Sequence, residues 1–227
     1  MYVPPFIPQQ IEIPGNAAQA PYLVRLGFIR RVVTSHAASV ALLIGLSYLP
    51  HVLSITEAAI LTLASLLFLS LVRGLVKGKR YEQALSALVA PFLFLGLSQL
   101  IGFGPDRGWP QWLIGLGPVG ILVYTLACGR DLSFMGMYLL TSLFVILAIV
   151  GLRLAGAFST SIVFEAGAIS LAFIAFFVYD LAALLTRRRL GEEIGAVLDL
   201  YRDALNFTTY TVRVIRHWRK HRIWSLK

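Results

Sequence analysis

The sequence predicts an all-α membrane protein built as a seven-helix transmembrane bundle, and three observations lead to that fold class. The chain has 227 residues, of which 58% are hydrophobic and only 14% charged, with a mean hydropathy of +0.77. A soluble domain carries about a quarter charged residues. The apolar residues gather in long runs, and a helix of about 20 such residues crosses a bilayer core of about 30 Å. Because the runs lack the two-residue alternation of barrel strands, we expect helices.

Seven apolar runs follow one another along the chain. They cover residues 33–53, 56–76, 83–103, 110–128, 132–153, 160–185 and 193–215. The first six are uniformly apolar, so each is predicted to span the bilayer. The seventh contains several charged side chains, which are costly in hydrocarbon unless they face the interior of the bundle or water.

The parts of the chain outside these runs complete the predicted organisation. Residues 1–32 are expected to form an irregular cytoplasmic segment, because prolines interrupt its first part. Residues 33–216 form the predicted transmembrane domain, and residues 217–227 form a basic tail. Eleven Lys and Arg residues precede the first run or follow the second, fourth and sixth, whereas the other loops hold two. The N-terminus is therefore expected in the cytoplasm, while the side of the tail stays open.

Several function classes are disfavoured by the sequence. The net charge of +9 does not indicate a nucleic-acid partner, because the basic residues lie in clusters between apolar runs. Residues 115–120 match the pattern G-x-G-x-x-G, but they lie within an apolar run and lack the strand that a dinucleotide site needs. The lone Cys128 and the scattered histidines offer no metal-binding or nucleophile pattern. We therefore expect neither an enzyme nor a bound cofactor.

The seventh run carries its polar residues on one side of a helix. At 100° per residue, these side chains fall within about 40° of one line: Asp199, Asp203, Asn206, Tyr210, Arg213 and His217. Such a stripe fits a last helix enclosed by the other six, with Asp199, Arg202, Asn206, Tyr210 and Arg213 lining or modulating an ion pathway. The alternative is an amphipathic helix that lies flat on the membrane.

Two of the charged residues are predicted to meet inside the bundle. Asp180 lies about 10 Å along its helix from Arg187, and Asp203 lies about 16 Å beyond Glu192 in the antiparallel last helix. Two carboxylates in one buried site cannot both ionise easily, so we expect them to share a proton. Without that proton they would repel each other and offer a weak, transient Ca²⁺ site. Arg202 could pair with either acid.

Four stretches resemble motifs of the transmembrane Bax inhibitor motif family. The segment "AVLDLYRDALNF" is similar to the last-helix signature A-x-L-x-L-Y-x-D-x-x-N-x-F of that family. Three further stretches agree in order: "VRLGFIRRV" before the first run, "RDLSFMGMYLL" at the start of the fifth and "FFVYD" at the end of the sixth.

The resemblance implies both a fold and an activity. It implies seven transmembrane helices with the last enclosed by the other six, in a bacterial inner (plasma) membrane. It further implies a pH-sensitive Ca²⁺ leak with Asp180 and Asp203 as the paired aspartates of the pH sensor and gate. Arg202 departs from the family, which has an apolar residue there. The alternative function is a non-conducting regulator that binds other membrane proteins through its basic tail.

Overall fold

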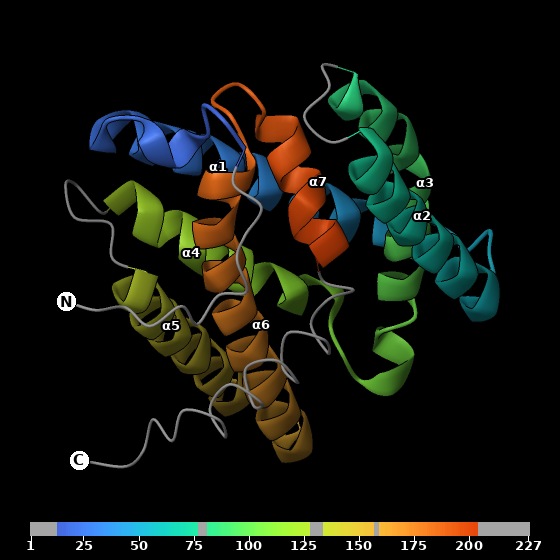
Figure 1. The fold of residues 1–227 in the computed structure, drawn as a ribbon. Helices are drawn as coiled ribbons and strands as arrows, with labels where there is room; N and C mark the ends of the chain where they lie inside the picture. Colours follow the sequence, from blue (N-terminus) through green and yellow to red (C-terminus); the bar gives the residue numbers. More distant parts are fainter. Residues whose placement is uncertain (1–12, 77–80, 128–133, 157–158, 204–227) are drawn as a thin grey trace, which may run out of the picture.

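The computed structural model describes residues 13–76, 81–127, 134–156 and 159–203, and in these residues the chain forms α-helices and short 3₁₀ turns without any strand (Figure 1). The α-helices run in this order: α1 Tyr22–Ser47, α2 Ile55–Val76, α3 Glu82–Gly102, α4 Leu116–Ala127, α5 Phe134–Leu154, α6 Thr160–Arg187 and α7 Glu193–Asp203. The 3₁₀ turns are Ala17–Gln19, Pro105–Arg107 and Gln111–Gly115. The all-α fold class is therefore confirmed over these ranges.

Five of the helices in the described ranges are long and apolar enough to cross a membrane, namely α1, α2, α3, α5 and α6. At the fourth apolar run, which is also predicted to span, the described helical stretch Gln111–Ala127 is shorter than these five. This stretch begins as a 3₁₀ turn, and Pro118 then lies in the first turn of α4. A proline is tolerated there because the first helical N–H groups have no intrahelical partner.

The first helix begins earlier than predicted. Residues 1–32 were expected to be irregular, but α1 begins at Tyr22, directly after Pro21. The buried side chains of α1 recur every three or four residues, which is the period of one helix face: Leu26, Ile29, Val33, His36, Val40 and Leu43. Arg30 belongs to this helix and its Nε donates to the carbonyl of Thr125 at the end of α4, 2.9 Å away. The basic residues expected to flank a helix are part of it.

Glycines allow two pairs of helices to pack closely. A Cβ at Gly120 of α4 would lie 2.9 Å from the Thr141 side chain of α5, and one at Gly96 of α3 would lie 2.5 Å from Oγ1 of Thr62 in α2. Both approaches are closer than side-chain contacts allow, so a larger residue would push the helices apart. Gly120 belongs to the pattern at residues 115–120, which thus serves helix packing.

The described part of α7 lies between α1 and α6 on one side and the pair α2 and α3 on the other (Figure 1). Residues 195–200 are all buried, so this stretch of α7 is covered on every side. The main apolar core joins side chains of α1, α4, α5, α6 and α7. A smaller core joins α2 and α3, and Tyr201 of α7 packs against both.

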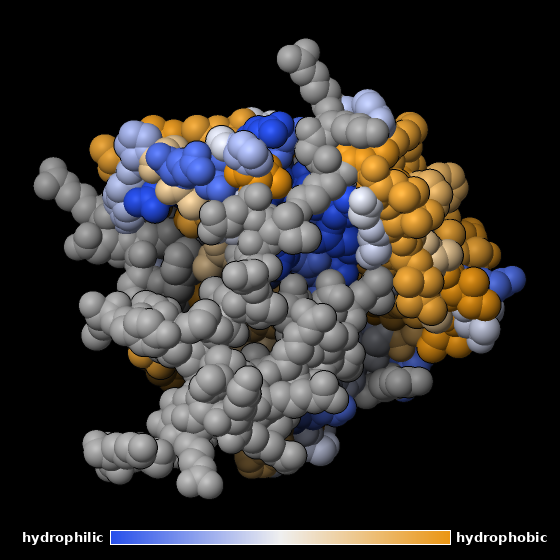
Figure 2. Space-filling model, viewed as in Figure 1, coloured by the Kyte–Doolittle hydropathy of each residue, from blue (hydrophilic) through white to orange (hydrophobic). Residues whose placement is uncertain are grey.

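A large hydrophobic surface covers α2 and α3, on the right of Figure 2, whereas hydrophilic surface gathers near the centre and over the start of α1. Large apolar side chains of α2 and α3 are exposed: Leu63, Leu67, Phe68, Leu71, Leu88 and Phe92. Soluble monomers rarely expose a continuous apolar patch of this kind. The surface and the five long apolar helices are consistent with an integral membrane protein.

Candidate functional site: a buried chain of charges

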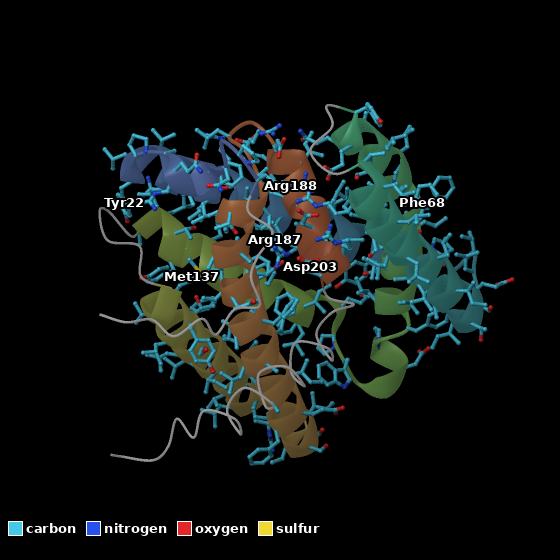
Figure 3. All side chains as sticks on the ribbon, viewed as in Figure 1. Tyr22, Phe68, Met137, Arg187, Arg188 and Asp203 are labelled. Atoms are coloured by element: carbon cyan, nitrogen blue, oxygen red, sulfur yellow. The ribbon has the colours of Figure 1, made fainter. Side chains whose placement is uncertain are left out.

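The two predicted aspartates come together where the end of α6 faces α7. Asp180 is fully buried in α6 and Asp203 is 1% exposed at the last described residue of α7. Arg187 bridges them, because its Nη1 lies 2.6 Å from Oδ2 of Asp203 and 3.4 Å from Oδ1 of Asp180. Figure 3 shows Arg187, Arg188 and Asp203 gathered in this region.

The carboxyl groups of Asp180 and Asp203 lie beside each other, because Nη1 of Arg187 contacts both. A hydrogen bond between two carboxyl groups requires a proton on one of them, because neither oxygen of an ionised carboxylate can donate. Oδ2 of Asp180 is buried and has no donor among the described residues. A proton shared across the pair would satisfy that oxygen and remove the repulsion between two buried negative charges.

Arg202 joins this pair to a third acid. Its Nη2 lies 2.6 Å from Oδ1 of Asp203, and its Nη1 lies 2.7 Å from Oδ1 of Asp199, one turn earlier in α7. The sequence left open whether this guanidinium would pair with Asp180 or with Asp203, and in the structure it binds Asp203 together with Asp199. Asp203 thus receives two arginines, whereas Asp180 receives one, at a longer distance.

Arg188 carries the pairing on to α3. Its Nε lies 2.6 Å from Asp199 and its Nη2 lies 3.0 Å from Glu82. Burial opposes the charge of Arg188, but the carboxylates of Asp199 and Glu82 outweigh this effect and raise the pKa of its guanidinium above the ordinary value. Glu82 also accepts from Arg73 of α2 at 2.7 and 3.0 Å.

Together these residues form a continuous chain of alternating charges, which we call the charged chain. Its members in spatial order are Arg73, Glu82, Arg188, Asp199, Arg202, Asp203, Arg187 and Asp180. Burying an ion is costly unless it is paired, and here each member has a partner of opposite charge. The charged chain joins α2, α3, α6 and α7, and Arg73 also donates to the carbonyl of Arg187, 3.0 Å away.

Half of the charged chain was not singled out from the sequence. Arg73, Arg187 and Arg188 belong to the basic residues that orient the predicted bundle, and Glu82 lies just before the third apolar run. One signal was available for Arg187, because a separation of seven residues from Asp180 places both on the same helix face. Asn206, Tyr210, Arg213 and His217 lie outside the described residues.

The arrangement bears on the predicted Ca²⁺ site. The described residues contain no group of three or more His, Cys, Asp or Glu side chains that could hold a metal ion. The oxygens of Asp203 are bound by Arg187 and Arg202, so a cation could use the aspartate pair only after these guanidinium groups moved. Any Ca²⁺ contact here belongs to a different arrangement of α6 and α7.

Comparison of the chain with protein-family models, with curated proteins and with solved structures finds no match. The resemblance to the transmembrane Bax inhibitor motif family therefore rests on the sequence motifs alone. A functional proposal must be supported by those motifs together with the contacts of the charged chain.

Proposed function

We propose that this protein is a pH-sensitive Ca²⁺ leak pathway in which the Asp180–Asp203 pair is the gate. The observation that carries the proposal is the proximity of two buried carboxyl groups, one on α6 and one on α7, which share Arg187 and leave Oδ2 of Asp180 without a donor among the described residues. The proposal includes a seven-helix bundle with the last helix enclosed, a cytoplasmic N-terminus and a bacterial inner membrane. The burial of residues 195–200 on every side of α7 supports the enclosed helix.

The gate works through repulsion between the two acids. With one shared proton, the pair holds α6 to α7 and the pathway is closed. When the proton leaves, two negative charges face each other at short range in a medium of low dielectric constant, and they separate. The freed oxygens are the ligands that a hard cation such as Ca²⁺ prefers. Flux should therefore increase as the pH rises.

The experiment is a flux measurement in liposomes that enclose a Ca²⁺ dye, at a series of pH values between 6 and 8. The wild type should admit Ca²⁺ faster at the higher pH. Asp180→Asn and Asp203→Asn should each remove the pH dependence, because an amide neither titrates nor repels. Glu193→Gln is the matched control, since this acid pairs with the exposed Arg31 and lies outside the charged chain. Absence of flux in correctly oriented wild-type protein at every pH would contradict the proposal.

Arg202 sets the expected rate. Its guanidinium binds both Asp199 and Asp203, so it places a positive charge where the cation would pass. Arg202→Leu restores the apolar residue of the family pattern and should increase Ca²⁺ flux severalfold at high pH. The same liposomes and dye measure this effect, with Arg31→Leu as the surface control.

The non-conducting regulator is favoured by a different observation. The charged chain is paired throughout, which is the property of a fixed latch as much as of a gate. A regulator would bind other membrane proteins through residues 217–227, which lie outside the described residues. Deleting residues 217–227 separates the two functions: loss of partner binding with unchanged flux supports the regulator, and loss of neither supports the leak alone.

A further inference from the structure

A cavity of about 310 Å³ lies between α1, α3, α4, α6 and α7. Its walls are almost wholly apolar, and aromatic rings contribute much of them: Trp109, Phe173, Phe176, Phe177 and Tyr201. No member of the charged chain lines it. This volume is in the range of small-molecule pockets, and a dry cavity of half this size holds benzene. The cavity therefore has room for a molecule of about two fused rings.

One polar side chain in the cavity wall has no side-chain hydrogen-bond partner among the described residues. His36 of α1 is 3% exposed, and neither of its ring nitrogens has a hydrogen-bond partner among the described residues. Its ring packs against Phe177 and Tyr201, with centroid distances of 4.8 and 5.1 Å. A buried imidazole in such surroundings is neutral, so it offers one N–H donor and one acceptor nitrogen. Leaving both unused is unfavourable, and buried polar groups in proteins are rarely left so.

The other described polar groups near His36 do not hydrogen-bond to its ring nitrogens. The Tyr201 hydroxyl is bonded to Oγ of Ser39, 2.7 Å away, and Ser39 donates in turn to the carbonyl of His36. That hydrogen bond engages the main-chain carbonyl of His36 and leaves both ring nitrogens without a partner among the described residues. The ring is thus a fixed polar anchor within an aromatic pocket.

The cavity also has an apolar entrance. Three of its lining side chains are exposed, Ile114 at 41%, Ile169 at 54% and Phe173 at 37%. Ile169 and Phe173 lie in the middle of α6, one of the five helices that are apolar and long enough to cross a membrane. A ligand that enters beside them would come from the hydrocarbon phase and must be soluble in lipid.

We propose that this cavity is a binding site for a lipid-soluble aromatic alcohol or phenol whose hydroxyl group hydrogen-bonds to His36. A hydroxyl group both donates and accepts, so it can satisfy an imidazole nitrogen in either tautomer. The rings Phe173, Phe176 and Phe177 favour a flat aromatic body by stacking and edge contacts. The site is separate from the Asp180–Asp203 gate and does not depend on the proposed leak.

The test compares 2-naphthol with naphthalene, which differ by the hydroxyl group alone. Equilibrium dialysis against the full chain in nanodiscs, with empty nanodiscs as the reference, corrects for partition into lipid. The wild type should bind 2-naphthol about tenfold more tightly than naphthalene, which is the ratio expected for one buried hydrogen bond. His36→Phe keeps an aromatic ring in the wall, so it should reduce 2-naphthol affinity about tenfold and leave naphthalene affinity unchanged.

Two further measurements test whether the probes bind in this cavity and contact His36. Ser170→Phe fills the cavity without altering His36 and should weaken both probes. The side-chain ¹⁵N signals of His36, assigned by their loss in His36→Phe, should shift on addition of 2-naphthol and not of naphthalene. Equal affinities for the two probes in the wild type would mean that the cavity takes apolar chains without His36 and would overturn the proposal. Absence of binding by either probe, or undiminished 2-naphthol binding in His36→Phe, would overturn it too.

Discussion

The charged chain and the His36 cavity meet at two neighbouring residues of α7, Arg202 and Tyr201. Among the described residues, buried polar groups are paired with one another in the charged chain, whereas the imidazole in the cavity wall is not. In the charged chain, Arg202 and its neighbours satisfy one another within the protein. In the cavity, one residue earlier in α7, Tyr201 packs against an imidazole whose nitrogens have no partner among the described residues. Polar groups that are paired internally fix the helices, whereas an unpaired one is available to a ligand.

Removing a polar side chain should also have different effects in the charged chain and in the cavity. Deleting one ion of a buried pair leaves its partner as an uncompensated charge, which is strongly destabilising. Deleting an unpaired polar group removes a cost that the folded state already carries. The two regions should therefore respond to mutation with opposite sign, and the following predictions test this from the largest effect to the smallest.

Arg188→Met should give the largest loss of stability. The substitution leaves Asp199 and Glu82 without one of their close cationic partners in a buried site, at a cost of about 3–5 kcal/mol in the free energy of unfolding. Denaturant unfolding in detergent, followed by circular dichroism, measures it. Arg31→Met is the matched control: its partner is Glu193 and its side chain is largely exposed, so we expect about 0–1 kcal/mol. Equal effects at the two positions would show that the charged chain stabilises no more than a surface pair.

His36→Phe should act in the opposite direction and raise the free energy of unfolding of the ligand-free protein by about 1–2 kcal/mol. The phenyl ring keeps the contacts with Phe177 and Tyr201 and removes two unpartnered nitrogens. The same unfolding experiment applies, with His51→Phe as the control, because His51 is exposed and stacked on Phe103. A loss of stability in His36→Phe would indicate that the imidazole has a partner in the folded protein and would remove the contrast between the two regions.

Tyr201→Phe should have the smallest effect, a loss of about 0.5–1 kcal/mol, since it deletes one neutral hydrogen bond to Ser39. The ring contacts with both cores would remain. A double-mutant cycle with Ser39→Ala isolates the interaction, and we expect the double variant to be little less stable than Ser39→Ala. Strictly additive losses would mean that the two hydroxyl groups stabilise the protein independently.

The number of helices and most of their bounds follow from apolar runs, because a run long enough to cross a bilayer reveals itself by composition alone. The errors arise where composition and structure differ. At Arg30 and Arg31 the charges interrupt the run, yet the buried positions of α1 continue at helical spacing back to Leu26. At Gln111 the run continues, yet the chain turns as a 3₁₀ helix before α4 begins.

The proximity of Asp180 and Asp203 could be predicted because a short loop joins their two helices, and each residue lies a similar distance along its helix from that loop. The partners of that pair could not be anticipated in full. Arg188 follows the last residue of α6 and has an extended main chain, so no helical period indicates where its side chain points. Glu82 reaches Arg188 through the packing of α3 against α7, a contact between segments about a hundred positions apart in the sequence.

The close approach of α2 and α3 at Gly96 has a mechanical consequence. Because the Thr62 main chain and Gly96 are nearly in contact, the two helices cannot slide past each other easily and move as one plate. The pair carries the broad apolar surface of Figure 2, and it is bonded to the end of α6 through Arg73, which donates to the carbonyl of Arg187, and through Glu82, which pairs with Arg188. In the proposed gate, a movement of α6 away from α7 would therefore also act on α2 and α3 together.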